Sequence, residues 1–593
     1  MLVYGDPKFE GQLQALRTRL CTLVNHALEN QGNLDVLRKL LILCGQVEQG
    51  AHDTLAQALQ PDEAKAFITH FHLATAHAAE AFYSIAYKQP VALPPPMVDT
   101  DTALRNLLHT LDNLHDAPDL TLAIKLPEGF SIYALYPEQY LVAAAQWLAE
   151  HSLQRSHGVV VVGIRSIGTT LAAVVSAVLR AAGWQVHSFT VRPTGHPFTR
   201  QVDSSGMQIA PHAFGLIIDE GPGISGSSMA AAASALVKAG IDRHNIAFFP
   251  GHPHDPGGAS SEEVQAWWQT TPRYVADTKS LTFNGVALQD ALTSTLPEPI
   301  IQIEDFSSGL WRHYLYPDSS VWPGLCTAFE RIKYRYTLQS GKKVLFKFLG
   351  LASISPDLAS TAESAADLLN ERATRGLAAP VLGAAYGFVA TEWIEGTPLS
   401  PSVSSPEMIE LTSIYIAQTA GPSMQDGESR MAIECLIEML NVNIREAFGE
   451  EVANLTQRYC LSAMELQPTY GDGHMQPYEW IVDKDNKLCK VDSVGHDCDH
   501  TLVGKQSVAW DLAGAIVEWR LEGEAIEQLL KAFSAAGGTI IDAATLDFYR
   551  IAYLAFRLGQ CSLAAQVHDP NERERLLSAS EVYRQQLAEF LGL

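Results

Sequence analysis

The chain has 593 residues, with 41 Lys and Arg against 66 Asp and Glu, which gives a formal net charge of -25. A chain of this length exceeds a single hydrophobic core and is expected to fold as about three domains. The excess of acidic residues opposes a broad electrostatic attraction to nucleic acid or to an anionic membrane. We therefore expect small-molecule partners, with neither nucleic acid nor membrane among them.

The first residues and the cysteines indicate the compartment. The start, "MLVYGDPKFEGQ", lacks a basic region followed by an apolar core, and no apolar run is long enough to span a bilayer. The 8 cysteines are scattered and form no CxxC pair. We predict a cytoplasmic protein with reduced thiols.

Residues 1–125 are helical in pattern. The stretch "FEGQLQALRTRLCTLVNHAL" repeats apolar residues at intervals of three and four, as an amphipathic helix does. His72 and His77 lack close ligand partners, so solvent exposure or core packing accounts for them better than a metal site does. We expect this region to be a packing or homo-oligomerisation element.

Residues 126–300 alternate short apolar strands with alanine-rich helices. "GVVVVG" leads into "LAAVVSAVLRAAG", and "FGLIIDE" leads into "MAAAASALVKAG". Continuous apolar strands separated by helices indicate a parallel sheet covered on both faces. Ligands of such sheets bind beyond the carboxyl ends of the strands, where both glycine-bearing loops lie.

The stretch "GLIIDEGPGISGSSM", residues 215–229, combines two acids with a loop of glycines and serines. A glycine-rich turn at a helix N-terminus offers backbone N–H groups to a phosphate, and Ser225, Ser227 and Ser228 add hydroxyl donors. Asp219 and Glu220 suit ribose hydroxyls, or a divalent ion carried by the substrate. The stretch predicts a ribose 5-phosphate site.

This stretch resembles the phosphoribosyl-pyrophosphate (PRPP) motif of type I phosphoribosyltransferases, although its loop is one residue longer. "VGIRSIGTT" is similar to the pyrophosphate loop of that family, and "TVRPTGHPFTR" would form a mobile lid. The resemblance implies that Asp219 and Glu220 act on the ribose. It implies a PRPP-binding set of Gly223, Ser225, Gly226, Ser227, Ser228, Arg165, Ser166, Gly168, Thr169, Arg192 and Arg200. An unrelated doubly wound domain, whose glycine loops merely turn the chain, is the other reading.

The third region, 301–593, begins with two alternating strands around a Ser-Gly turn in "ERIKYRYTLQSGKKVLFKFLGL", with Lys347 in the second strand. A helix and the stretch "ATEWIEG" follow, and "YGDGH", "KVDS" and "WDLAG" come much later. Phosphoryl transfer needs a cation for the nucleotide phosphates, a carboxylate for the attacking hydroxyl and an acid for magnesium. The region supplies these groups in that order.

This order resembles the aminoglycoside and choline kinase branch of the protein-kinase-like fold. The resemblance implies an ATP site with Lys347, its helix partner Glu363 (or Glu371), and Glu392 to Ile394 at the adenine. It implies Asp472 as the catalytic aspartate and Asp511 as the structural aspartate behind it. Magnesium would be held by Asp492 and by Glu479, which stands nearest the place of the family's asparagine.

Three observations leave alternatives open in this region. The asparagine expected after Asp472 is missing, and no glycine-rich nucleotide loop precedes Arg331, so an inactive kinase-like domain is the alternative. "GHDCDH" crowds possible zinc ligands on one loop, but such crowding rarely closes a tetrahedral site, and the proximity of Asp492 already explains the loop.

The predicted fold is multidomain, α/β and α+β. It has a helical N-terminal region (1–125), a parallel-sheet phosphoribosyltransferase-like domain (126–300) and a bilobal protein-kinase-like domain (301–593). The predicted function is a bifunctional enzyme that combines phosphoribosyl transfer with ATP-dependent phosphorylation of a small-molecule hydroxyl, using Mg²⁺. Linked domains of this kind resemble biosynthetic modules of bacterial stress and tellurium-resistance gene clusters. The alternative is a PRPP- or nucleotide-sensing regulator with an inactive kinase-like scaffold.

Overall fold

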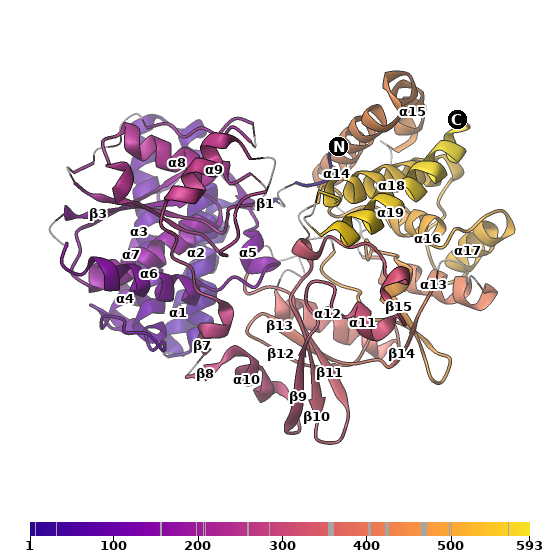
Figure 1. Cartoon of the computed structure of the whole chain (residues 1–593), viewed down its shortest axis with the longest axis horizontal. Helices are drawn as coiled ribbons and strands as arrows, with labels where there is room; N and C mark the ends of the chain where they lie inside the picture. Colours follow the sequence, from indigo (N-terminus) through magenta and orange to yellow (C-terminus); the bar gives the residue numbers. More distant parts are fainter. Residues whose placement is uncertain are drawn as a thin grey trace. The chain divides into compact units, whose positions relative to one another are not determined.

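The chain forms two compact units, drawn together in Figure 1. The parallel-sheet unit comprises Lys8–Ser294 and Gly350–Pro356, and the antiparallel-sheet unit comprises Met1–Pro7, Thr295–Leu349 and Asp357–Leu593. The three-part division expected from the sequence stays a prediction. The computed structural model describes residues 1–5, 8–30, 32–154, 157–196, 198–204, 207, 209–210, 212–223, 225–257, 260–283, 285–353, 361–400, 405–421, 426–463, 471–496, 499, 501–566 and 569–593.

Two general expectations can be compared with the described part of the chain. None of its helices has both the length and the apolar character needed to cross a bilayer. Each cysteine in the same residues is a free thiol.

The parallel-sheet unit begins with a strand and four helices, α1 to α4, of which α2 and α3 pack tightly against each other. Buried residues recur along one face of α1 and α4, as the spacing of apolar residues predicted, whereas α2 is buried on all sides from Leu40 to Ala51. The residues "FEGQ", expected to be helical, instead form a strand that pairs antiparallel with a segment more than 100 residues away. These elements are β1 (Lys8–Gln12), α1 (Leu13–Glu29), α2 (Leu34–Ala58), α3 (Pro61–Ala86), α4 (Thr100–Asp112) and β2 (Thr121–Lys125).

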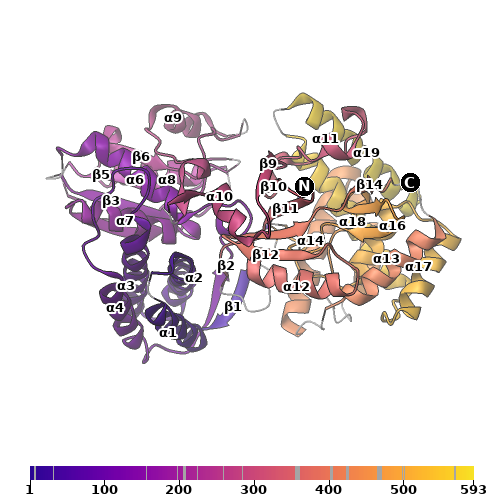
Figure 2. The same ribbon diagram turned by 90° about the horizontal axis from the view of Figure 1, so that it is seen from below.

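The parallel sheet expected from the sequence is present, with strand order β4-β3-β5-β6. Every residue of β3, β5 and β6 is buried, which explains their continuous apolar sequences. Figure 1 shows α8 and α9 on one face and α7 on the other, and Figure 2 shows α1 to α4 beyond α7. The elements are α5 (Glu128–Ser131), α6 (Pro137–His151), β3 (Val159–Ile164), α7 (Ile167–Ala181), β4 (Val186–Val191), β5 (Phe214–Ile218), α8 (Ser227–Lys238), β6 (Ile246–Phe249), α9 (Glu262–Thr270), β7 (Thr282–Phe283), β8 (Val286–Ala287) and α10 (Leu288–Leu292).

The antiparallel-sheet unit begins with a sheet of order β12-β13-β11-β10-β9. The hairpin predicted around the Ser-Gly turn is confirmed: β10 and β11 pair with Lys333 directly opposite Lys347. Helix α12 follows β11 and opens with a capping box of Thr361 and Ser364. The elements are β9 (Ile300–Asp305), α11 (Arg312–Leu315), β10 (Lys333–Leu338), β11 (Lys343–Phe348), α12 (Ala362–Thr374), β12 (Val381–Ala385) and β13 (Phe388–Glu392).

The rest of this unit is a helical lobe that holds a small sheet of order β14-β15-β16. Its main core surrounds α18, which packs against α14, α16 and α19 through buried residues such as Leu440, Trp510 and Phe548. The start of the chain joins this core, because Val3 is buried in it and Asn443 bonds the backbone of Leu2. The elements are β14 (Gly396–Pro398), α13 (Pro406–Thr419), α14 (Asp426–Phe448), α15 (Glu450–Ala463), β15 (Trp480–Asp483), β16 (Leu488–Lys490), α16 (Ala509–Glu518), α17 (Glu524–Ala535), α18 (Ala543–Ala564) and α19 (Pro570–Leu591).

Candidate functional site

In the antiparallel-sheet unit, the lysine of β11 meets the carboxylate that follows β16. Lys347 Nζ donates a hydrogen bond to Asp492 Oδ1, although 145 residues separate them. Burial lowers the pKa of Lys347. At Asp492 burial opposes the charge, but Lys347, His496 and Lys333 together hold the pKa of that carboxyl well below its usual range. The contact joins the sheet to the loop that carries Asp492.

The loop around Asp472 is held by Asp511 in α16. The carboxylate of Asp511 accepts hydrogen bonds from the backbone N–H groups of Asp472 (2.7 Å) and Gly473 (2.8 Å). A Cβ on Gly471 would lie 1.9 Å from Asp511 Oδ2, so only glycine admits this close approach. Burial, with the charge of Asp472 in addition, raises the pKa of Asp511 to about 7. Asp511 therefore holds the backbone of the loop that carries Asp472.

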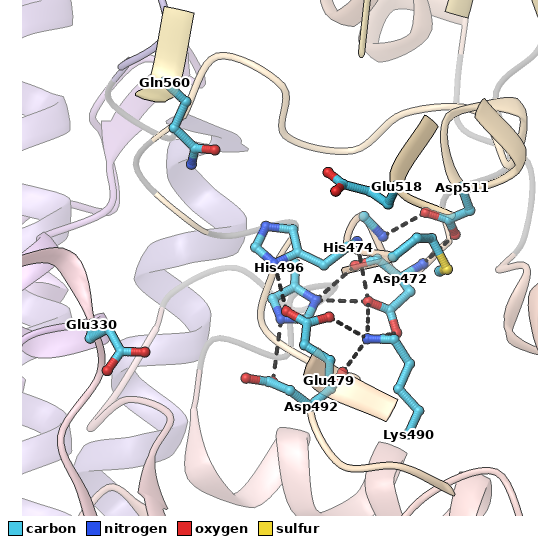
Figure 3. A network of polar contacts seen from close by, with 12 residues as sticks. Glu330, Asp472, His474, Glu479, Lys490, Asp492, His496, Asp511, Glu518 and Gln560 are labelled. Atoms are coloured by element: carbon cyan, nitrogen blue, oxygen red, sulfur yellow. Dashed lines mark hydrogen bonds and ion pairs between the residues drawn. The ribbon is translucent and has the colours of Figure 1, made fainter. Parts of the chain in front are cut away.

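The side chain of Asp472 is fully buried and surrounded by donors. Tyr415 donates its hydroxyl proton to Oδ2, Lys490 Nζ lies 3.2 Å from Oδ2, and His496 Nδ1 lies 2.8 Å from Oδ1. Burial opposes the charge, but Lys490 and His496 hold the pKa of Asp472 far below its usual range. Figure 3 shows the contacts of Asp472 with Lys490 and His496 from close by. In this conformation, a substrate hydroxyl could reach Asp472 only by replacing one of these donors.

Asp492 and Glu479 differ as potential Mg²⁺ ligands. Mg²⁺ demands near-octahedral coordination by available oxygens. Asp492 fits this requirement, since its side chain is 24% exposed and its ion pairs with Lys347 and His496 both use Oδ1. Glu479 does not fit: it is 7% exposed, and its two oxygens face Lys490 Nζ at 2.9 Å and His474 Nδ1 at 3.3 Å.

His496 bridges two carboxylates rather than offering a free nitrogen. Its Nδ1 faces Asp472, and its Nε2 lies 3.3 Å from Asp492 Oδ1. Burial would lower the pKa of His496, but hydrogen bonds to the two carboxylates raise it to about 9, so the ring is an imidazolium. His474 stacks on it at 4.0 Å between ring centroids.

The ligand atoms of His474, Glu479 and His496 lie within 4.8 Å of one another, which is close enough for a metal ion. A protonated imidazole has no lone pair for a metal. Because His496 uses both nitrogens on carboxylates, we interpret the cluster as a hydrogen-bonded network. Of the other residues of "GHDCDH", Asp497, Cys498 and His500 lie outside the described residues, and Asp499 is described.

The other predicted ATP residues lie around the sheet. Glu392 is the last residue of β13, and Ile394 lies two residues further, where the chain leaves the sheet. Glu363 is exposed in the first turn of α12, and Glu371 pairs with Arg375. Lys347 forms its ion pair with Asp492, and the pairing with Glu363 stays a prediction.

Helix α12 also presents a buried cation that the sequence reading missed. Arg372 lies 3.9 Å from Asp472 Oδ2, and its side chain is 9% exposed. The sequence signal for Arg372 is a charged residue on the apolar face of a helix.

The segment before Arg331, in which the sequence analysis found no glycine-rich nucleotide loop, is a folded connection between two strands. Residues 306–332 join β9 to β10 and include α11. Arg312 in α11 forms a buried bidentate ion pair with Glu572 of α19, at 3.0 and 2.9 Å. This pair ties the connection between two sheet strands to the helical lobe.

At the end of this connection lie two further basic residues. Lys333 stands opposite Lys347 in the β10–β11 register and pairs with Glu330 at 3.2 Å. Arg331 is buried and donates to the carbonyl of Gly495, three residues after Asp492. Like charges directly opposite each other in a sheet are destabilising, and the ion pairs of Lys333 with Glu330 and of Lys347 with Asp492 offset this repulsion.

In the parallel-sheet unit, Asp53 of α2 engages two arginines that were expected to bind pyrophosphate. Arg165, after β3, lies 3.4 Å from Asp53 and donates to His52 Nδ1 at 2.6 Å; Arg192, after β4, pairs with Asp53 and donates to the carbonyl of Arg165. Burial and the charge of Arg165 lower the pKa of His52 to about 4, which keeps that ring neutral. A diphosphate would have to compete with Asp53 for both guanidinium groups.

The two acids and the serine loop lie at the carboxyl end of β5. Burial raises the pKa of Asp219 to about 7, and Glu220 accepts a hydrogen bond from the backbone of Gly129 at 2.7 Å. Ser225 Oγ lies 3.0 Å from Ser227 Oγ at the start of α8. Between them, Gly226 adopts φ +63° and accepts a hydrogen bond from Trp268 Nε1, so one of the tryptophans of "VQAWWQ" supports this loop.

The remaining predicted phosphate residues occupy the nearby loops. Ser166 precedes α7, and Arg200 donates to the carbonyl of Gly195. A Cβ on Gly168 would lie 2.5 Å from the carbonyl oxygen of Ile218, so this glycine permits close packing of α7. Thr169 Oγ1 is buried and has no hydrogen-bond partner among the described residues. Gly223 and Ser228 lie in the serine loop and the first turn of α8, and Ile224 between them lies outside the described residues.

No family model and no curated protein matches this sequence. Among solved structures, choline kinase LicA from Streptococcus pneumoniae aligns over 50% of this chain and 98% of its own, with 14% identity and a TM-score of 0.32. Macrolide 2'-phosphotransferase MphH from Brachybacterium faecium aligns over 49% and 96%, with 12% identity and a TM-score of 0.31. Spectinomycin phosphotransferase APH(9)-Ia, solved with ADP and spectinomycin, aligns over 51% and 96%, with 10% identity and a TM-score of 0.32.

Proposed function

We propose that the antiparallel-sheet unit transfers the γ-phosphoryl group of ATP to a hydroxyl of a small molecule. The observation that carries the proposal is the convergence on one network of Lys347 with Asp472 and Asp492, which lie more than 100 residues later in the chain. Phosphoryl transfer is achieved mainly by positioning and by electrostatic stabilisation, and these residue types supply both. The products would be ADP and a phosphate monoester.

Each residue has a part in this reaction. Lys347, with Lys333 opposite it, would contact the phosphates, and residues 392–394 would receive adenine. Asp472 would orient the hydroxyl on a loop that Asp511 holds. Mg²⁺ held by Asp492 would offset the charge of the phosphates.

The test is ADP release by the full-length protein with ATP and Mg²⁺ across a panel of amino alcohols, aminoglycosides, sugars and nucleosides. We expect one class to raise ADP release, and Asp472→Asn to reduce that rate by about 100-fold or more, in the range of a positioned acid or base. The matched control is Asp485→Asn, which removes an exposed carboxylate of the β15–β16 turn. A full rate in Asp472→Asn would refute the assignment of Asp472.

The enclosure of Asp472 favours a second candidate, a regulator whose kinase-like unit binds nucleotide without turnover. Three donors and a nearby arginine occupy its carboxylate. A fluorescent ATP analogue that binds the wild type but not Lys347→Ala, with no ADP release for any acceptor, would support the regulator. Acceptor-dependent ADP release would exclude it.

We further propose that the parallel-sheet unit binds a phosphorylated ribose such as PRPP and acts in phosphoribosyl transfer. The support is the placement of Asp219, Glu220 and Arg165 after neighbouring parallel strands, with the serine loop opening α8. The double variant Asp219→Asn with Glu220→Gln should lose PRPP binding by calorimetry and keep nucleotide binding. Unchanged PRPP affinity in the folded double variant would refute this site.

A further inference from the structure

The ammonium group of Lys490 lies at the centre of the carboxylate cluster. Its Nζ is 2.9 Å from Glu479 Oε2 and 3.2 Å from Asp472 Oδ2, and it also donates to the backbone carbonyl of Asp492. Its side chain is completely buried, as are those of Asp472 and, nearly, Glu479. Three acceptors saturate the three donors of an ammonium group.

The backbone fixes Lys490 in this place. In the β15–β16 ladder, Lys490 stands opposite Trp480, and the N–H of Val491 continues the ladder to the carbonyl of Glu479 at 2.9 Å. Glu479 and Lys490 are therefore neighbours by strand register. The rings of Tyr415 and Trp480, with centroids 5.9 and 5.8 Å from Nζ, lie beside the ammonium group.

The carboxylates of the cluster find their donors within the protein. Asp472, Glu479 and Asp492 are contacted by Lys347, Lys490, His496 and, at 3.9 Å, Arg372. Lys490 bridges Asp472 to Glu479, and His496 bridges Asp472 to Asp492. Removing one partner of a buried ion pair is costly, so these contacts resist replacement by a metal.

We propose that Lys490 takes the place of a divalent cation between Asp472 and Glu479. The centre then accepts a single Mg²⁺, at the more exposed Asp492, and Glu479 serves to hold Lys490. The inference rests on the proposed ATP site only for the ion at Asp492. The place of Lys490 itself is tested by metal binding alone.

The test counts bound Mn²⁺ by electron paramagnetic resonance in the full-length protein, first without nucleotide and then with a non-hydrolysable ATP analogue. Glu479→Gln and the control Asp485→Asn remove the same charge from one β-hairpin. Both are expected to keep the wild-type Mn²⁺ stoichiometry, with dissociation constants within about threefold of the wild type. A loss of one Mn²⁺, or a tenfold weakening, in Glu479→Gln but not in Asp485→Asn would overturn the proposal.

Lys490→Met provides the complementary measurement, because it leaves Asp472 and Glu479 facing each other without their shared cation. It is expected to bind one Mn²⁺ more than the wild type, with a melting temperature that rises on addition of Mn²⁺. A folded Lys490→Met protein with no additional Mn²⁺ would overturn the proposal. If Lys490→Met does not fold, the Mn²⁺ stoichiometry and affinity of Glu479→Gln alone test the proposal.

The Mn²⁺ expected at Asp492 is tested by a separate variant. Asp492→Asn is expected to lose one Mn²⁺ in the presence of the nucleotide analogue. An unchanged count would refute the ATP-site assignment while leaving the result for Lys490 intact.

Discussion

Raising the pH should remove the proton of His496 and, with it, a defined part of the stability of the antiparallel-sheet unit. Against the opposing effect of burial, Asp472 and Asp492 raise the pKa of His496 from its ordinary 6.5 to about 9 in the folded protein. A raised folded-state pKa contributes stability that is fully present below pH 6.5 and is lost as the pH rises through 9. At about 1.4 kcal/mol per pKa unit, the expected loss is about 3 kcal/mol.

The comparison with His496→Gln isolates this contribution. Glutamine keeps a donor toward Asp472 but cannot titrate, so the variant should lack the part of the loss between pH 6.5 and 9 that His496 causes. Asp511, whose pKa burial raises to about 7, titrates in both proteins and cancels in the comparison. The titratable groups in contact with His496 are Asp472, Asp492 and His474. The pKa values of all three are lowered, so none of them titrates in this window.

The measurement must report on this unit alone, because a chain of two compact units has no single free energy of unfolding. Met475 is fully buried in the antiparallel-sheet unit, so its oxidation by peroxide across a urea series measures the unfolding of that unit. We would record midpoints at pH 6, 7.5 and 9.5 for both proteins. Equal pH dependence in the wild type and in His496→Gln would refute the reasoning.

Three further predictions follow from buried contacts. Arg312→Met should destabilise the antiparallel-sheet unit by about 1.5–3 kcal/mol, because it removes the bidentate partner of the buried Glu572 and leaves Arg575 as its remaining cation; a change below about 1 kcal/mol in the Met475 assay would contradict this. Tyr415→Phe should lower the KM for the acceptor hydroxyl, because it removes a neutral donor from Asp472; an unchanged KM would show that the hydroxyl does not compete with Tyr415. Asp53→Asn should tighten pyrophosphate binding about tenfold, or about 1.4 kcal/mol, by freeing Arg165 and Arg192; calorimetry showing the same affinity as the wild type and the exposed control Asp62→Asn would argue against a phosphate role for these arginines.

The parts of the fold that were predictable are those that local sequence determines. The β10–β11 hairpin, the buried strands β3 and β5, and the helix after each of them follow from apolar periodicity and turn residues. Strand β1 was missed, because its conformation depends on pairing with β2 more than 100 residues away. Strand preference depends on such context more than helix preference does.

In the candidate site, too, some residues could be predicted from the local sequence and others could not. Lys347, Asp492 and Asp511 could be selected from short motifs, and the structure brings them into one network. Their charge partners could not, because Tyr415 and Arg372 reach Asp472 from helices 57 and 100 residues earlier in the chain. A lysine within the strand sequence "LCKVD" was the one local signal for Lys490.

The chemistry around Asp472 bears on the choice between enzyme and regulator. Displacing Lys490 or His496 would leave a buried charge without its partner, whereas displacing Tyr415 would exchange one neutral hydroxyl donor for another. A substrate hydroxyl is chemically equivalent to the phenol hydroxyl, so it can take that position without changing the charge of the cluster. Tyr415 is therefore the donor whose displacement would open Asp472 to a substrate. If no acceptor displaces it, the same contacts hold a unit that binds nucleotide without transferring its phosphate.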